Sequence, residues 1–337
     1  MKPSDPAREP DAFADLARAM RRRFGGAARL DNIVVPSLGG SNRTVVFDLV
    51  DGAARRRLVS RQRTYRGADN PFIDDAHQFA VMSAAYGRGF PVPEPILLFD
   101  PEDGLGEGFV TAFVSGETMP NRILTGAAYD TVRPRLAGLA GELLALLHSI
   151  PASEVPALAL YPDSDDPIEA QRRRYDFYAE PHPAIELGFR WLERNRPSRG
   201  TAQLLHGDFR TGNLMVDQTG IVTVLDWECS HVGQPAEDIG WLCSRSWRFG
   251  HHDRPVGGFG QRHELMAAYR DAGGRDIQAD EIRYWEIFGL VRWAVLNMMQ
   301  AHGHIFGGRR SPAFAACGRN TSVIEYDLLI SLKGLHQ

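Results

Sequence analysis

The chain has 337 residues, 43% of them hydrophobic, which is enough to bury the core of one large domain or two smaller ones. Lys and Arg number 38 against 42 Asp and Glu, a formal charge of −4, so the composition excludes an overall basic surface for nucleic acid or an anionic membrane. The three cysteines lie far apart without CxxC spacing and the N-terminus lacks the apolar core of a signal peptide, which favours a cytoplasmic protein with free thiols.

The first third of the chain predicts one helix followed by a strand-rich unit. Apolar residues at helical spacing over 12–24 predict a helix that ends at two glycines. From Ile33 onward three apolar runs, IVVPSL, TVVFDLV and RLVSRQ, are separated by a Gly-Gly turn and an Asp-Gly turn, which is typical of connected strands. A helix over 76–86, the extended FPVPEPILLF and the strand FVTAFV complete this unit.

After SGETMP, residues 115–120, the pattern becomes helical. Leucines repeat along one face of residues 133–150 and predict a buried helix. Residues 151–167 are rich in Pro, Asp and Ser and predict a surface loop. Further helices are predicted over 168–178, 184–195, 261–272, 280–301 and 322–332.

These elements predict an α+β fold in which a strand-rich part precedes a mainly helical part. We expect an N-terminal helical segment at 1–28, a strand-rich N-lobe that binds nucleotide phosphates at 29–114, and a helical C-lobe at 115–337. The C-lobe is expected to hold the catalytic loop and the substrate pocket.

The segment HGDFRTGN, residues 206–213, contains more polar chemistry than a turn requires. A solvated turn needs only glycine and small polar residues, so His206, Asp208 and Asn213 indicate a functional loop. Two short strands, LMVD and IVTVLD, follow around a glycine turn and end at Asp226. Folding this hairpin back brings Asp226 near Asn213.

The residue types in this loop suit phosphoryl transfer. The Asn213 amide and the Asp226 carboxylate are oxygen ligands of the kind that Mg²⁺ prefers when phosphate oxygens fill its other positions. Asp208 then remains to accept the proton of an attacking hydroxyl. A catalytic-loop Asp, an Asn ligand and a second Asp after a hairpin form the pattern of kinases, which need a metal ion and a positioned base.

A glycine turn upstream predicts the cover over the nucleotide phosphates. In LGGSNRTVVF, Gly39 and Gly40 let the backbone approach phosphate oxygens closely, and Ser41 and Asn42 add donors. The sequence GxxxxGK[ST] does not occur, which excludes a phosphate loop of the helix-opening type.

Arg61 stands on the third strand where kinases place the lysine that binds the nucleotide phosphates. An arginine is always charged and binds phosphate bidentately, so we expect it to keep this role. Kinases hold that lysine with a glutamate from the following helix, but Gln78 occupies the expected position here. Asp74 and Asp75, one turn earlier, are candidate substitutes, and the alternative for Gln78 is an ordinary surface residue.

Other polar residues near the loop receive structural interpretations or stay open. His206 is interpreted as a packing and hydrogen-bonding residue of the loop. Arg210 either steadies Asp208 or faces the substrate phosphate. Glu237 and Asp238 stand at the start of a predicted helix, where we interpret both as caps of backbone N–H groups.

Six segments occur together in an order that resembles the aminoglycoside phosphotransferase family, the small-molecule kinases that include choline kinase-like enzymes. They are LGGSNRTVVF, RLVSRQ, FPVPEPILLF, FVTAFVSGETMP, HGDFRTGNLMVD and VLDWECSHVGQPAEDIGWL. The chain looks closest to a bacterial branch related to the kinase-like domain fused to some acyl-CoA dehydrogenases.

The resemblance implies a bilobal protein-kinase-like fold with ATP or GTP between the lobes and a hinge near 112–116. It implies that Ala112 and Val114 contact the nucleotide and that 39–44 is the phosphate loop. It also assigns Asp208 as the catalytic base, Arg61 as the phosphate-binding cation, and Asn213 and Asp226 as the Mg²⁺ ligands.

The expected activity is therefore an ATP- or GTP-dependent transfer of the γ-phosphoryl group to a hydroxyl of a small molecule. A polycationic aminoglycoside requires a pocket lined by carboxylates. The helical segments mix acids with many arginines, so a neutral or anionic hydroxy compound is the alternative acceptor. The tryptophans of the helical part are expected to be core residues, and the alternative is that one of Trp247, Arg248 and Trp285 lines the substrate pocket.

Two rival functions are weighed against this one. A nucleotide-binding pseudokinase that acts as a regulatory or interaction module usually lacks a base or metal position, whereas Asp208, Asn213 and Asp226 are all present. A kinase with a protein acceptor is disfavoured because no activation segment is evident after Asp226. The sequence distinguishes neither ATP from GTP nor one oligomeric state from another.

Overall fold

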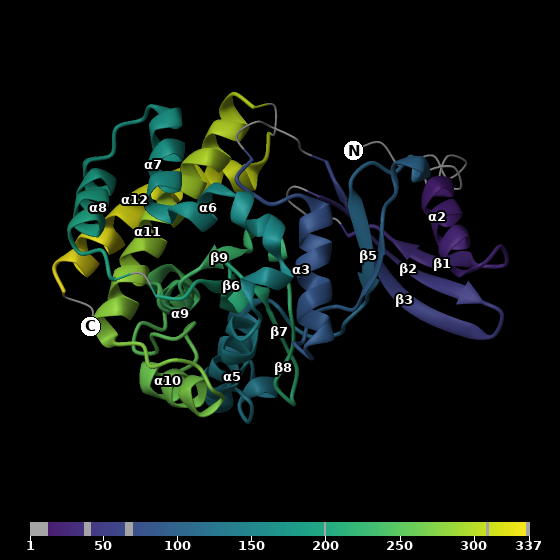
Figure 1. Ribbon diagram of the computed structural model, residues 1–337, viewed down its shortest axis with the longest axis horizontal. Coiled ribbons are helices and arrows are strands. Elements are labelled where there is room, and N and C mark those ends of the chain that lie inside the picture. Colours follow the sequence, from purple (N-terminus) through teal and green to yellow (C-terminus); the bar gives the residue numbers. More distant parts are fainter. Residues whose placement is uncertain (1–12, 37–41, 65–69, 199, 308–309, 335–337) are drawn as a thin grey trace. The chain divides into compact units, whose positions relative to one another are not determined.

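The structure is a computed structural model that describes residues 13–36, 42–64, 70–198, 200–307 and 310–334 (Figure 1). The chain divides into two compact units, Met1–Ser115 and Gly116–Gln337. A five-stranded antiparallel sheet characterises the first unit and helices dominate the second, so the predicted α+β class is confirmed. No helix within the described ranges combines the length and apolarity needed to cross a bilayer.

The N-terminal unit is built on one twisted sheet with strand order β1-β2-β3-β5-β4. Its described strands and longer helices are α2 (Ala14–Phe24), β1 (Arg29–Val34), β2 (Asn42–Asp51), β3 (Ala54–Arg63), α3 (Asp75–Gly87), β4 (Pro95–Leu98) and β5 (Gly108–Ala112). β2 and β3 form a long hairpin, and every neighbouring pair in the sheet is antiparallel.

One face of this sheet forms the core of the N-terminal unit. Alternate residues of β2, among them Val45 and Phe47, are buried together with Leu58 of β3 and Val110 of β5. The amphipathic helix α2 covers this face and inserts the buried Met20. The period-two pattern of the apolar runs therefore selects which side of each strand enters the core.

The first strand lies earlier in the chain than predicted. The sequence predicts a strand from Ile33, but β1 begins at Arg29, because Arg29 and Leu30 already pair with the far end of β2. The predicted phosphate-binding residues Gly39, Gly40 and Ser41 lie outside the described residues. Asn42 is the first residue of β2.

The C-terminal unit is mostly helical, with two short two-stranded sheets between the helices. Its longer described elements are α4 (Pro120–Thr125), α5 (Leu136–His148), α6 (Pro162–Asp165), α7 (Pro167–Tyr178), α8 (Pro183–Arg194), β6 (Gln203–Leu205), β7 (Leu214–Val216), β8 (Ile221–Val224), β9 (His231–Gly233), α9 (Pro235–Cys243), α10 (Arg262–Asp271), α11 (Ala279–Ile305) and α12 (Pro312–Leu332).

Residues 151–167 lie mostly at the surface as predicted, but they are not an irregular loop. This segment forms short 3₁₀ turns at Ala152–Glu154 and Pro156–Leu160, and the helix α6 follows. Leu158 is buried because the turns fold its side chain back into the unit. Frequent prolines marked breaks between short helical turns and not an extended loop.

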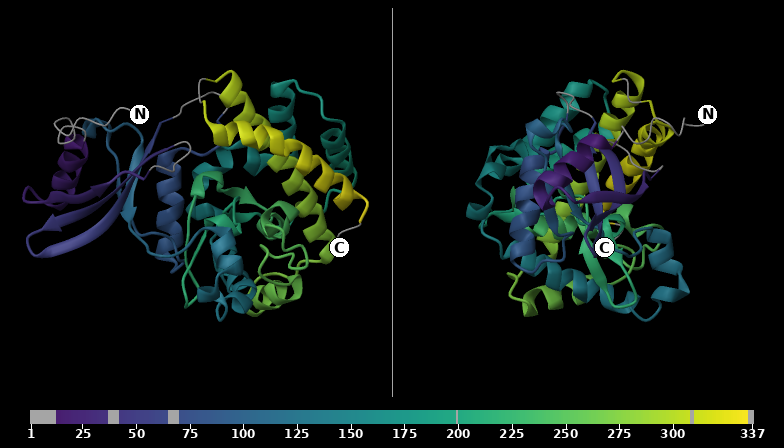
Figure 2. Two further views of the ribbon diagram at one scale, coloured as in Figure 1. Left: turned by 180° about the vertical axis from the view of Figure 1, so that it is seen from behind. Right: turned by 90° about the vertical axis from the view of Figure 1, so that its right-hand side faces the viewer.

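Helix α11 runs through the centre of the C-terminal unit. It is apolar on nearly every side and packs against α7, α8, α9 and α12, as its sequence predicts for a buried helix. The left view of Figure 2 shows α12, in yellow, lying along α11, against which it packs. Gly240 of α9 permits close packing, since a Cβ there would lie 2.5 Å from the Trp285 Cβ of α11.

Two glycines one turn apart on α5 provide a test of how closely α5 and α10 pack. A Cβ on Gly141 would lie 2.3 Å from the Leu265 carbonyl oxygen, whereas a Cβ on Gly138 would lie 3.8 Å from the Ala268 Cβ. We expect Gly141→Ala to lower the free energy of unfolding by about 1–3 kcal/mol through overpacking. The control Gly138→Ala should leave it unchanged or raise it by up to about 1 kcal/mol, since alanine is the better helix former.

Urea denaturation of both variants measures this difference. Equal stability of the two variants would contradict the packing of α5 on α10 described above.

Candidate active site

The polar loop predicted at 206–213 connects β6 to β7 and ends in a 3₁₀ turn, Thr211–Asn213. β7 pairs with β8, and the Leu225 N–H donates to the Asn213 carbonyl at 2.9 Å. The backbone leading to Asp226 therefore returns to Asn213, as predicted from the hairpin. Asp226 adopts a left-handed conformation with φ of 61°, which is uncommon for a residue with a Cβ and typical of a functional site.

Three side-chain donors hold the carboxylate of Asp208. Its Oδ1 accepts hydrogen bonds from Arg210 Nε at 3.0 Å and from Trp241 Nε1 at 2.9 Å. Its Oδ2 accepts one from Asn213 Nδ2 at 2.6 Å. Of the two roles weighed for Arg210, the structure supports the one in which it steadies Asp208.

His206 is buried directly behind this carboxylate. The Asp208 N–H donates to its Nδ1 at 3.1 Å, and its Nε2–H donates to the Leu225 carbonyl at 3.0 Å. One ring nitrogen accepts and the other donates, so the imidazole is neutral. Burial lowers the pKa of His206, which agrees with that state and with the predicted structural role.

Asp238 holds the start of the loop at 206–213. Its interpretation as a helix cap is wrong. Its two carboxylate oxygens accept the N–H groups of His206 and Gly207, each at 2.8 Å, instead of those of its own helix. His148 Nε2 lies 3.3 Å from Asp238 Oδ2. Burial alone would raise the pKa of Asp238, but the hydrogen bonds from His148 and the loop hold it below its ordinary value.

Glu237 is not a helix cap either, because it forms a buried ion pair with His231. The His231 ring donates from Nε2 to Glu237 Oε1 at 3.1 Å and from Nδ1 to the Cys229 carbonyl at 2.9 Å. Both partners are acceptors, so the ring carries two protons and a positive charge. Burial opposes this charge, but the Glu237 carboxylate raises the pKa of His231 to about 9.

Arg292 is a loop contact that sequence reasoning missed. From the middle of α11 its Nη1 donates to the Gly207 carbonyl at 2.5 Å, and its guanidinium lies over the Trp241 ring at 5.0 Å. His148 was missed as well. Neither residue lies in a recognisable motif or near the loop in sequence, so no local signal could have identified them.

Aromatic rings extend the contacts around the Asp208 carboxylate. Trp241, which donates to Asp208, packs against Trp247 with ring centroids 5.1 Å apart. The Arg210 guanidinium lies over the Trp247 ring at 4.6 Å. Both donors on Asp208 Oδ1 are thus fixed by the same tryptophan, which stands in a short 3₁₀ turn, η8 (Arg245–Arg248).

The residues predicted to bind Mg²⁺ fit that ion by their donor chemistry. Asn213 Nδ2 donates to both the Asp208 carbonyl, at 2.9 Å, and its Oδ2, so only the oxygen of the amide can bind a cation. That oxygen and the Asp226 carboxylate are hard ligands. Among the described residues no group of three or more His, Cys, Asp or Glu is placed to hold a metal ion, so this site differs from closed sites of the zinc type.

In the N-terminal unit, Asp75, one of the two substitutes considered for the missing glutamate, contacts Arg63 of β3. It is 2% exposed, and its Oδ2 accepts from Arg63 Nε at 3.0 Å. Burial raises the pKa of Asp75, while the charges of Arg63 and Arg61 oppose that rise. Asp74 instead caps the helix, since its side chain accepts the His77 N–H.

Gln78 is 1% exposed, which excludes the alternative of a surface residue. Its Nε2 donates to the Ile73 carbonyl at 3.1 Å and to Asp75 Oδ1 at 3.4 Å. Arg63 also donates to the Ile73 carbonyl, at 2.6 Å. The amide therefore holds Asp75 in position for the arginines.

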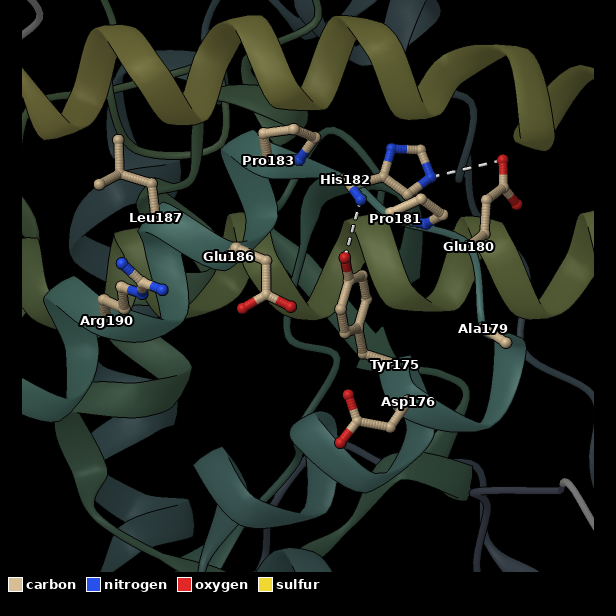
Figure 3. A pocket seen from close by; sticks show the side chains of 10 residues that line it. All are labelled: Tyr175, Asp176, Ala179, Glu180, Pro181, His182, Pro183, Glu186, Leu187 and Arg190. Carbon is tan, nitrogen blue, oxygen red and sulfur yellow. Dashed lines mark hydrogen bonds and ion pairs between the residues drawn. The ribbon is translucent and has the colours of Figure 1, made fainter.

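A pocket of about 820 Å³ lies beside the connection from α7 to α8, residues 179–182, and is lined by residues of both helices (Figure 3). His182 lines the pocket. The backbone N–H of His182 donates to Tyr175 Oη at 2.8 Å, and the ring Nε2 lies 3.5 Å from Glu180 Oε1. Glu186 also lines the pocket, but both its oxygens accept from Arg172, at 2.8 and 3.0 Å. This ion pair reduces the negative charge that a polycationic ligand would need.

Comparison with known protein families gives one match that covers most of the chain. The model of the family described as "Phosphotransferase enzyme family" matches residues 32–274. Acyl-CoA dehydrogenase family member 11 of Gallus gallus is 31% identical over 222 residues, which are 61% of this chain and 27% of that protein. The human protein of the same name is 30% identical over 182 residues, 50% of this chain and 23% of that one. The chain thus spans about a quarter of the length of these relatives.

Solved structures share the fold over nearly the whole chain. A Ralstonia eutropha protein named as an aminoglycoside phosphotransferase has a TM-score of 0.73 at 24% identity, covering 95% of this chain and 98% of that one. A macrolide 2′-phosphotransferase of Brachybacterium faecium has a TM-score of 0.57 at 20% identity, covering 91% and 97%. Spectinomycin phosphotransferase in complex with ADP and spectinomycin has a TM-score of 0.60 at 13% identity, covering 92% and 96%. These likenesses confirm the predicted kinase-like fold.

The buried pair of His231 and Glu237 predicts a pH dependence of stability. The pKa of His231 is raised from its ordinary 6.5 to about 9, so the stabilisation is complete below about pH 6.5 and is lost as the pH rises through about 9. We expect the free energy of unfolding to fall by up to roughly 3 kcal/mol over this range. The double variant His231→Gln, Glu237→Gln lacks the titrating pair and should not show this fall.

Urea denaturation of both proteins at pH 6.5, 8 and 9.5 tests this. Parallel pH profiles for wild type and double variant would show that His231 is not charged in the folded state.

Proposed function

We propose, because the chain belongs to the phosphotransferase enzyme family, that it transfers the γ-phosphoryl group of ATP or GTP to a hydroxyl of a small molecule. Asp208 is the general base in this proposal. The observation that carries it is the set of donors on the Asp208 carboxylate, which fix both oxygens in a loop that also supplies Asn213.

The contacts of Asp208 support its role as a base. A carboxylate offers about four lone-pair positions. Arg210 and Trp241 use two on Oδ1, and Asn213 uses one on Oδ2, which leaves a position on Oδ2 for the acceptor hydroxyl. A base in this orientation holds the hydroxyl in one direction and accepts its proton as the phosphoryl group is transferred.

Asn213 and Asp226 are the proposed ligands of a Mg²⁺ ion. When bound, this ion would neutralise the charge of the phosphate oxygens. The chain's own residues set the donor positions: the Asn213 nitrogen is held by Asp208, and the backbone of Asp226 is fixed in a left-handed conformation.

The N-terminal unit is proposed to bind the nucleotide. Gly39, Gly40, Ser41 and Asn42 are the proposed phosphate contacts, and Arg61 is the proposed cation on β3. Ala112, the last residue of β5, and Val114 are proposed to contact the nucleotide further along the chain. Nucleotide use is supported by relatives of this fold that are described in complex with ADP.

The proposed acceptor is a small hydroxy compound. Proteins of this fold include a macrolide 2′-phosphotransferase and an ethanolamine kinase, so the fold accommodates acceptors of different size. The pairing of Glu186 with Arg172 gives no support to a polycationic acceptor in the α7–α8 pocket. Asp176 and Glu180 also line this pocket, so its charge does not select between a polycationic and a neutral or anionic acceptor, and the acceptors tested below include both classes.

Asp208→Asn tests the proposed base. Loss of a general base should lower the rate of phosphoryl transfer by about 10²–10⁴-fold. Asp217→Asn is the matched control, because Asp217 accepts the Thr219 and Gly220 N–H groups in the turn between β7 and β8, and an amide oxygen can replace it. Transfer from ATP and GTP with Mg²⁺ is measured against aminoglycosides, macrolides, choline, amino alcohols, sugars and hydroxyacyl-CoAs.

Nucleotide binding without transfer to any acceptor or to water, unchanged in Asp208→Asn, would support the pseudokinase instead.

The two arginines of β3 are expected to respond differently to substitution. Arg61→Met should raise the KM for the nucleotide by about tenfold or more through loss of a charged hydrogen bond to the phosphates. Arg63→Met should instead lower the free energy of unfolding by about 3 kcal/mol, because it leaves Asp75 buried without its closest cation.

Steady-state kinetics and thermal melts of both variants give the comparison. A normal nucleotide KM in Arg61→Met would remove Arg61 from the proposed site.

A further inference from the structure

A second concentration of charge lies in the C-terminal unit, away from the residues that contact Asp208. A cavity of about 270 Å³ is lined by residues of η8, α10, α11 and the end of α12. Four of them are arginines: Arg245 and Arg248 of η8, Arg262 of α10 and Arg283 of α11. No part of the proposed phosphoryl transfer uses them.

The carboxylates around this cavity do not balance the four guanidinium groups. Glu286 lies 2.5 Å from Arg262 Nη2 and 3.9 Å from Arg248 Nη2, so one carboxylate serves two cations. Burial raises the pKa of Glu286, although these arginines oppose the rise. Asp327 lies beside the cavity and accepts from Arg245 Nε at 2.6 Å.

Asp280 is the other carboxylate that lines the cavity. It is exposed, and its Oδ1 accepts the N–H of Glu281 in the first turn of α11. With Asp280 and Asp327 counted, three carboxylates face four guanidinium groups, and one net positive charge remains.

Several N–H donors of these arginines are paired with neutral carbonyl oxygens, or have no hydrogen-bond partner among the described residues, instead of being paired with carboxylates. Arg248 is 5% exposed, yet its Nε and Nη2 both donate to one neutral acceptor, the Cys243 carbonyl, at 3.1 and 2.8 Å. Arg245 Nη1 is buried and has no hydrogen-bond partner among the described residues. Arg283 Nη2 has two long hydrogen bonds, to the carbonyls of Ser331 and Leu332 at 3.3 and 3.4 Å, and its guanidinium lies over the Trp191 ring at 5.9 Å. Buried cationic donors of this kind are costly unless an acceptor completes them.

The N-terminus of α11 adds backbone donors on the same cavity wall. Ala279, the first residue of this 27-residue helix, lines the cavity, and the preceding Gln278 makes no side-chain cap. The first N–H groups of a helix have no partner within it and favour negative charge.

We propose that this arginine pocket binds a phosphate-type anion, either inorganic phosphate or the terminal phosphate of a small molecule. The guanidinium group matches the oxygens of phosphate in pairs. A volume of about 270 Å³ admits a phosphate group and falls just below the range of roughly 300–1,000 Å³ that holds drug-sized ligands.

The turn η8 connects this pocket with the residues around the proposed base. Arg245 and Arg248 face the pocket, and between them Trp247 packs on Trp241 and under Arg210. An anion that orders the two arginines therefore also orders the tryptophan that fixes both donors on Asp208 Oδ1.

Titration of the full chain with sodium phosphate and with methyl phosphate tests the proposal. Calorimetry measures the affinity, and NaCl at matched ionic strength gives the background. The double variant Arg245→Gln, Arg283→Gln should bind both probes about tenfold or more weakly, because it removes two charged donors. Arg270→Gln is the matched control, since it removes one positive charge from an exposed part of α10 outside the cavity.

Folding of each variant is checked by circular dichroism. If the double variant is unfolded, Arg283→Gln alone serves, because Arg283 forms no ion pair within 4.0 Å in the described part of the chain, whereas Arg245 is paired with the buried Asp327. Equal affinity in variant and wild type, or no binding beyond that caused by NaCl, would overturn the proposal. Preference for inorganic phosphate identifies a free ion, and equal or tighter binding of methyl phosphate identifies a phosphate end group.

The proposal is independent of catalysis. Asp208→Asn should retain phosphate binding in this pocket, so failure of the proposed transfer would leave the result intact.

Discussion

The arrangement of the loop at 206–213 depends on the buried carboxylate of Asp238. This carboxylate accepts hydrogen bonds from two consecutive backbone N–H groups, those of His206 and Gly207. Asp238 and His206 are fully buried, so water cannot replace these hydrogen bonds. His148, at the end of α5, holds the same carboxylate, and Tyr269 of α10 lies 3.0 Å from the other nitrogen of His148. One charge therefore fixes the loop to α5, α9 and α10 together, and removing it would leave two buried donors unpaired.

Further hydrogen bonds connect the backbone held by Asp238 to the proposed base, Asp208. The fixed backbone at 206–207 sets His206, whose neutral ring accepts the Asp208 N–H. The Asp208 side chain then meets Arg210, Asn213 and Trp241. Asp208 Oδ1 accepts from two of these donors and Asn213 Nδ2 donates to two oxygens of Asp208, so the hydrogen bonds form one connected network.

The sequence predicted the features that are local and failed where distant residues decide. The loop, the β7–β8 hairpin and the return toward Asn213 depend on residues close together in the chain, and the structure confirms them. The capping role for Asp238 failed because its partners lie 31 and 32 residues away. Arg292, which is 85 residues from Gly207, had no local signal at all.

The same limit applies in the N-terminal unit. The sequence showed that Gln78 departs from the kinase pattern. It did not show that Arg63 would be the ion-pair partner of Asp75. Strand alternation places Arg61 and Arg63 on one face of β3, so spacing alone does not decide between them. The first strand was displaced for a related reason, because its start is set by pairing with β2 and not by its own apolar residues.

The fluorescence of the tryptophans around Asp208 should depend on the state of this carboxylate. Indole emission depends on nearby charge and on hydrogen bonding of the ring N–H, and Trp241 donates that N–H to the carboxylate proposed to change its protonation. Trp247 lies under the guanidinium that binds the same oxygen. Two of the six tryptophans in the chain are therefore intrinsic fluorophores beside the proposed base, and the emission of the unlabelled protein can report on the state of Asp208.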